Sequence, residues 1–156
     1  MSEEELMRVR LLAPFPNLEG TEFELTSPET HQYNCFAFAV GETHRWWQPS
    51  EEADHFWPAG ITRDLTVPSL LAAYGTVGFS SRLLASLPPT LPEGATQVAI
   101  YAKDGIATHA ARRVEADKWC SKLGPGVDLT HPLEALEGAL YGNVVGYAVR
   151  EPADLE

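Results

Sequence analysis

A proline-rich connector divides the sequence into two halves of different character. It reads Ser86-Leu-Pro-Pro-Thr-Leu-Pro-Glu-Gly94, and its prolines can continue neither a helix nor a central strand. Before it, apolar runs that follow capping residues and end at glycines predict helices. After it, strand-forming runs separated by turn residues predict a sheet. We therefore expect an α+β fold in which a helical half, 31–87, packs on a C-terminal antiparallel sheet, 95–150.

The size and charge of the chain limit its function. Its 156 residues with 44% hydrophobic content predict one folded domain, 1–156, that opens with an N-terminal segment, 1–30, showing little recognisable chemistry. The net charge of −11 repels phosphate backbones, so we expect no nucleic-acid partner. No apolar run approaches the roughly 20 residues of a membrane helix. The N-terminus is acidic, whereas a signal peptide begins with basic residues followed by an apolar run. We expect no membrane partner, a cytoplasmic location, and free thiols at Cys35 and Cys120.

One of these cysteines stands at the predicted start of a short buried helix. The stretch is His31-Gln-Tyr-Asn-Cys35-Phe-Ala-Phe-Ala-Val-Gly41, in which Asn34 suits the N-cap and Gly41 the C-cap. Unpaired N–H groups and the helix dipole favour a thiolate on the first turn, so Cys35 is a candidate nucleophile. The alternative is a small core residue, since free cysteine is often buried.

Three of the four tryptophans follow in a loop without periodicity. Trp46 and Trp47 lie before an acidic stretch, and Trp57 lies after it. A loop this rich in large rings either packs over the core or lines a groove. In the second case these residues are candidates for substrate binding, together with Gln32, Tyr33 and Trp119.

Strand and helix signals follow in a clear order. A cap at Thr66 and a proline in the first turn predict a helix that ends at Gly75. The remaining predicted elements are strands at 96–102 and 106–114 joined by Asp104-Gly105, a strand at 118–123 stopped by Gly124-Pro-Gly126, a helix at 132–140 and a closing strand at 143–149.

His109 is the candidate general base. It lies among small residues in Thr108-His-Ala-Ala111, which allows another element to approach closely. Cys35 and His109 can then act as nucleophile and base. A third polar group is needed to orient the imidazole, and Ser121 and Asp128 are equal candidates, with His131 third. The alternative is a half-buried strand histidine whose hydrogen bonds are satisfied.

This order of residues resembles a known fold. A helix-borne cysteine, then a strand-borne histidine, then a polar residue on a following strand is similar to the papain-like cysteine hydrolases, especially the NlpC/P60 and CHAP amidases. The chain also resembles a family of uncharacterised bacterial domains in Tyr33-Asn-Cys-Phe-Ala-Phe-Ala39, Thr108-His-Ala-Ala111, Trp119-Cys-Ser-Lys-Leu-Gly124 and Leu136-Glu-Gly-Ala-Leu-Tyr-Gly142. The resemblance implies a papain-like fold and a thiol hydrolase that cleaves an amide, peptide or related acyl bond without a cofactor.

Two other kinds of function remain open. One is a zinc site, which would draw ligands from His31, Cys35, His109, Cys120 and His131, although close Cys-x-x-Cys or His-x-x-x-His pairs are missing. The other is a binding or immunity-type module in which the tryptophan loop contacts a protein partner and Cys35 only packs. We expect no metal and take a peptide or amide substrate as the first choice of ligand.

Overall fold

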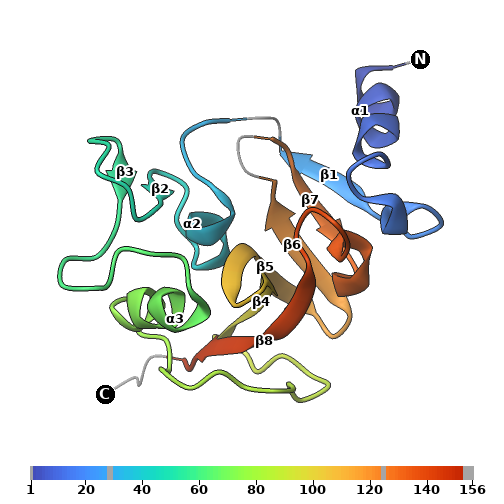
Figure 1. The fold of residues 1–156 in the computed structure, drawn as a ribbon. Coiled ribbons are helices and arrows are strands. Elements are labelled where there is room, and N and C mark those ends of the chain that lie inside the picture. Colours follow the sequence, from blue (N-terminus) through green and yellow to red (C-terminus); the bar gives the residue numbers. More distant parts are fainter. Residues whose placement is uncertain (1, 28–29, 124–125, 153–156) are drawn as a thin grey trace.

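The protein is a mixed α/β structure built around one six-stranded antiparallel sheet (Figure 1). The computed structural model describes residues 2–27, 30–123 and 126–152. The strand order is β1-β7-β6-β5-β4-β8. The strands are β1 (Glu24–Ser27), β4 (Thr96–Lys103), β5 (Ile106–Glu115), β6 (Lys118–Lys122), β7 (Asp128–His131) and β8 (Asn143–Arg150).

The predicted hairpin after the proline-rich connector is confirmed. β4 and β5 pair in antiparallel register around a turn in which Asp104 and Gly105 both have positive φ, 52° and 81°. Such a two-residue turn matches the twist of the flanking strands, and Asp-Gly is among its preferred sequences. β6 then returns beside β5, so the three consecutive antiparallel strands are as the sequence predicts.

The described residues in the first half of the chain form the α-helices α1 (Glu3–Leu11), α2 (Cys35–Ala39) and α3 (Val67–Gly75). The predicted N-caps of α2 and α3 are confirmed, because Asn34 accepts a hydrogen bond from the backbone of Ala37 and Thr66 accepts one from Ser69. The C-cap of α2 is Val40 rather than the predicted Gly41. In Figure 1, α2 and α3 lie on one side of the sheet, while α1 lies beyond the β1 edge. Within the described residues, no helix is long and apolar enough to cross a membrane.

The sheet separates two hydrophobic cores. One core joins α2 and α3 to inward residues of the sheet such as Val98, Ile100 and Ala110. The other joins the N-terminal segment to residues such as Tyr101, Trp119 and Leu129 on the opposite face. Because side chains of a strand alternate between faces, neighbouring residues such as Ile100 and Tyr101 of β4 enter different cores.

Part of the predicted C-terminal structure is wrong. The helix expected at 132–140 is only a 3-10 turn, η2 (Leu133–Leu136), because Glu137 has extended backbone angles and Gly138 has φ +147°. The segment 128–131, which was not predicted as a strand, forms β7 and pairs with both β6 and β1. The predicted turn Gly124-Pro-Gly126 falls partly outside the described residues, since Gly124 and Pro125 are not among them.

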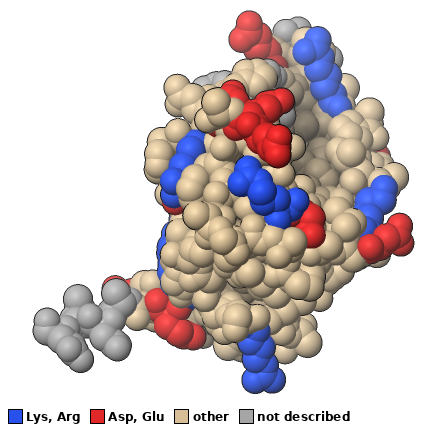
Figure 2. Space-filling view, turned by 60° about the vertical axis from the view of Figure 1, so that its left-hand side comes forward, with Lys and Arg blue, Asp and Glu red and all other residues tan. Residues whose placement is uncertain are grey.

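The tryptophan loop contains two short strands, β2 (Trp46–Trp47) and β3 (His55–Phe56), which pair in parallel. A second 3-10 turn, η1 (Pro16–Leu18), lies before β1. On the face shown in Figure 2, acidic and basic side chains are interspersed among uncharged residues, rather than gathered into a single basic stripe.

Candidate functional site

Asn34 holds the start of α2 against the tryptophan loop. Its Oδ1 accepts hydrogen bonds from the backbone N–H of Ala37 at 3.2 Å and of Trp47 at 3.1 Å. Its Nδ2 donates to the carbonyl oxygen of Trp47 at 2.7 Å. One buried amide therefore caps the helix and fixes the loop strand β2, so that Cys35 occupies a defined position at the first residue of α2.

The thiol of Cys35 is buried, with only 6% of the residue exposed. Burial raises its pKa to about 12, although hydrogen bonds from the backbone N–H groups of Ala110 and Phe36 lower it in part. The expected low-pKa thiolate is therefore wrong for the resting protein. A helix of five residues adds only a few aligned peptide dipoles, and these do not offset the loss of hydration around a charged sulfur.

His109 is completely buried in β5 and makes one hydrogen-bond chain. Its Nε2 lies 2.9 Å from Oγ of Ser121, and this Oγ lies 2.6 Å from Nε2 of His131. The Nδ1 of His131 in turn lies 2.7 Å from the carbonyl oxygen of Pro132. We call these four residues the His109 hydrogen-bond chain. Burial lowers the pKa of His109 well below its usual value and that of His131 to about 4, so both rings are neutral near pH 7.

The other nitrogen of His109, Nδ1, is buried and makes no hydrogen bond with any described residue. The ring itself is held in place, since Tyr141 stacks on it at 4.2 Å with an interplanar angle of 7° and Tyr101 contacts it edge-on at 5.2 Å. The alternative of a histidine with satisfied hydrogen bonds therefore does not fit Nδ1.

The side chains of Cys35 and His109 lie on opposite faces of the sheet. Cys35 packs in the same core as Ala107 and Ala110, whereas His109 contacts Tyr101 of the other core. Along the described chain, the β5–β6 pairing ends at Arg112 and Cys120 and does not include His109. On the face opposite the His109 ring, the backbone N–H of Ala110 lies close enough to the Cys35 sulfur to lower its pKa.

The two candidates for the third polar residue lie in different places. Ser121 contacts His109, whereas Asp128 accepts a hydrogen bond from the Tyr33 hydroxyl at 2.7 Å on the Cys35 face. Burial raises the pKa of Asp128, partly offset by this bond and by the nearby charge of Lys122. Ser121 and Asp128, which are equal candidates from the sequence, therefore lie on opposite faces of the sheet, and only Ser121 contacts His109.

The zinc alternative does not match the arrangement of its proposed ligands. Cys35 lies on one face of the sheet and His109 with His131 on the other, while His31 is exposed. Among the described residues, the group with three potential ligand atoms within 4.8 Å of one another is Glu52, Asp54 and His55, in the tryptophan loop. These are different residues, and two of them are exposed acids.

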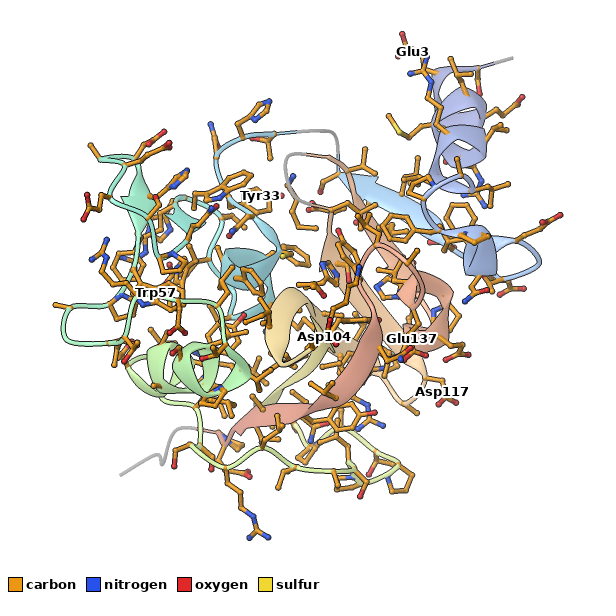
Figure 3. All side chains as sticks on the ribbon, viewed as in Figure 1. Glu3, Tyr33, Trp57, Asp104, Asp117 and Glu137 are labelled. Carbon is orange, nitrogen blue, oxygen red and sulfur yellow. The ribbon has the colours of Figure 1, made fainter. Side chains whose placement is uncertain are left out.

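The predicted substrate-binding residues divide into three groups. Gln32 and Trp46 line a surface cavity of about 680 Å³, which we call the tryptophan-loop cavity. Its remaining lining residues are His31, Thr43, His44, Arg45, Asp54 and His55. Tyr33, Trp47 and Trp57 are buried instead, and Figure 3 shows Tyr33 beside α2 and Trp57 above α3. Trp119 packs in the core on the opposite face of the sheet.

Sequence reasoning placed His131 only third among the candidates, although it completes the hydrogen-bond chain. Recognising 128–131 as a strand would have supplied the missing signal. Asp128 and His131 have opposite parity, so their side chains point to opposite faces and only one of them can share a face with His109. A segment of four residues is too short for its alternation of polar and apolar residues to predict a strand.

Residues 24–149 match a family described as a domain of unknown function, DUF7689. The chain belongs to this family. The family range begins at the first residue of β1 and ends one residue before the end of β8, so it spans nearly the whole six-stranded sheet together with α2 and α3. No curated protein and no solved structure matched the chain.

Proposed function

We propose that this DUF7689 domain is a papain-like thiol hydrolase in which Cys35 is the nucleophile and His109 the general base. The observation that supports this most is the buried Nδ1 of His109, which has no hydrogen-bond partner among the described residues. Such an atom costs free energy and needs an explanation, and a catalytic role supplies one. The N–H of Ala110, the residue after His109 in the sequence, lies close enough to the Cys35 sulfur to lower its pKa. Cys35 therefore lies next to the strand that carries His109.

The resting pair consists of a neutral thiol and a neutral imidazole. In the proposed reaction the thiol proton passes to Nδ1 of His109 while the sulfur bonds to the acyl carbon, and the carbonyl π electrons move to oxygen. When the tetrahedral adduct collapses, the amine leaves with the proton that Nδ1 returns to it. Water, deprotonated by the same nitrogen, then hydrolyses the thioester and regenerates Cys35.

Backbone N–H groups on the first turn of α2 are suited to the developing oxyanion. The N–H groups of Cys35 and Phe36 lie close enough to the sulfur to lower its pKa. N–H groups on a first helical turn have no intrahelical acceptor, so they are available for a negative oxygen next to the sulfur. Gln32, three residues before Cys35, lines the tryptophan-loop cavity, and we take this cavity as the approach for a peptide or amide substrate.

Acylation by p-nitrophenyl acetate tests the proposal. The Cys120→Ser variant leaves Cys35 as the only thiol, and it should release p-nitrophenolate and carry an acetyl group on Cys35 by mass spectrometry. His109→Gln should slow acylation by about a hundredfold or more, the usual contribution of a general base. The matched control is Arg82→Gln, at an exposed position outside the proposed site and the tryptophan-loop cavity, which should acylate like the parent. Equal acylation of parent and Cys35→Ala would show that the proposed site is not used.

A non-catalytic binding module is the second candidate. The raised pKa and burial of Cys35 favour it, as does the tryptophan-loop cavity with its mixture of aromatic and polar side chains. In that case Cys35 is a core residue. Cys35→Ala should then keep every binding property, and the parent protein should itself show no acylation. Acetylation of Cys35 that depends on His109 would decide against this candidate.

A further inference from the structure

The His109 hydrogen-bond chain has a definite direction. Pro132 contributes only a carbonyl oxygen, which can accept a hydrogen bond but cannot donate one. The Nδ1 of His131 must therefore carry the proton in that contact. A neutral imidazole has one N–H, so Nε2 of His131 is bare and can only accept.

The direction then passes along the chain to His109. The Ser121 hydroxyl must donate to the bare Nε2 of His131, at 2.6 Å. Having used its single hydrogen, Ser121 can only accept at its other contact, so Nε2 of His109 donates to it at 2.9 Å. His109 is thereby the Nε2–H tautomer, and its Nδ1 holds a lone pair.

We propose that His131 is a positioning residue that, through Ser121, fixes the tautomer of His109 so that Nδ1 can accept a proton. This inference rests on the proposed function, because a bare Nδ1 is the form that a general base for Cys35 requires. His131 touches neither the thiol nor a substrate. It acts through the strand order, since β7 carries it beside β6, and β6 carries Ser121 beside His109.

The surroundings of the His109 hydrogen-bond chain suit this role. His131 is 1% exposed, and Ser121 and His109 are fully buried, so bulk water does not compete for their hydrogen bonds. The stacked Tyr141 holds the His109 ring in the plane that the Ser121 contact needs. A buried chain of this kind loses a full hydrogen bond if one member reverses, which makes a single direction much more favourable than a mixture.

Nitrogen NMR of the full chain tests the proposal directly. Long-range proton–nitrogen spectra of ¹⁵N-labelled protein at pH 7.5 distinguish a protonated ring nitrogen from a bare one, and His109→Gln identifies the His109 signals by their loss. The wild-type protein should show His109 with its proton on Nε2. A proton on Nδ1 would overturn the proposal without any further variant.

Two variants test the part played by His131. His131→Phe removes the acceptor of Ser121, and Ser121→Ala, which adds no bulk, removes the link. Each should lower the Nε2–H to Nδ1–H ratio of His109 by about fivefold, the factor that corresponds to a net hydrogen bond of about 1 kcal/mol. His55→Gln, which lies outside the His109 hydrogen-bond chain, is the matched control and should leave the ratio unchanged. An unchanged ratio in Ser121→Ala would overturn the proposal even if His131→Phe does not fold.

Acylation of the same proteins separates this inference from the proposed function. If His109 has the predicted tautomer and responds to both variants while p-nitrophenyl acetate leaves Cys35 unmodified, the positioning role stands and the hydrolase proposal fails. If Cys35 is acylated in a His109-dependent way but the tautomer ratio does not respond, the hydrolase proposal stands and the positioning role fails.

Discussion

The Nε2 atom of His109 lies 2.9 Å from the Oγ atom of Ser121, beyond Arg112 and Cys120, the last residue pair of the β5–β6 ladder. A side-chain hydrogen bond thus links β5 and β6 where the described ladder between them has ended. On the opposite face of β5, the N–H of Ala110 lies close enough to the Cys35 sulfur to lower its pKa. The link between His109 and Ser121 is the structural basis of the proposed site.

The two cysteines should differ in reactivity in the resting protein. Cys35 is buried with a pKa of about 12, whereas Cys120 is partly exposed. Since the thiolate is the reactive form, Cys35 should react with iodoacetamide at pH 7 at least about a hundredfold more slowly than an ordinary thiol of pKa about 8.5. Peptide mapping after timed alkylation should find Cys120 modified first. Faster labelling of Cys35 would show a preformed thiolate and contradict the raised pKa of the buried thiol.

Asn34→Ala should destabilise the protein by about 2 kcal/mol. It removes a helix cap, worth about 1 kcal/mol, and leaves backbone groups of Trp47 without their buried partner. Urea unfolding followed by tryptophan fluorescence measures the change. Asn143→Ala, at an exposed position in β8, is the matched control and should change the free energy of unfolding by less than about 0.5 kcal/mol.

Trp46 and Trp47 should differ sharply although they are neighbours in sequence. Trp47 is fully buried against Phe56 and Tyr74, so Trp47→Ala should cost about 3–5 kcal/mol of unfolding free energy. Trp46 lines the tryptophan-loop cavity and stacks on His55, so Trp46→Ala should cost about 1 kcal/mol or less. Chemical denaturation of both variants provides the comparison. Similar losses would mean that Trp46 is also a core residue.

Stability should fall on mild acidification because of the buried histidines. The pKa of His131 is about 4 in the folded chain and about 6.5 in an unfolded one, so the unfolded state binds more protons between these values. The free energy of unfolding should therefore decrease by about 2 kcal/mol from His131 alone between pH 7 and pH 5. His109 adds a change of the same sign, whereas the raised pKa of Asp128 acts in the opposite direction.

Urea titrations at several pH values measure this slope. His131→Phe should flatten it, while Asn143→Ala, at an exposed position that does not titrate, should keep the wild-type slope. A slope that His131→Phe leaves unchanged would show that His131 titrates alike in the folded and unfolded chains.

The local elements of this protein are determined by the sequence alone. Asn34 caps α2, Thr66 caps α3, and Asp104-Gly105 turns β4 into β5, each as predicted. These features depend on residues at most a few positions apart, so their hydrogen bonds and backbone angles follow from local chemistry.

The tertiary structure alone decided the remainder. β7 exists because a short segment pairs with β6 and β1, strands on either side of it that no local pattern could select. That pairing put His131 next to Ser121 and Asp128 next to Tyr33, which the sequence could not distinguish. The pKa of Cys35 was likewise set by the packing of α2 against the sheet, because desolvation depends on everything that surrounds a group, while a helix start depends only on the residues within it.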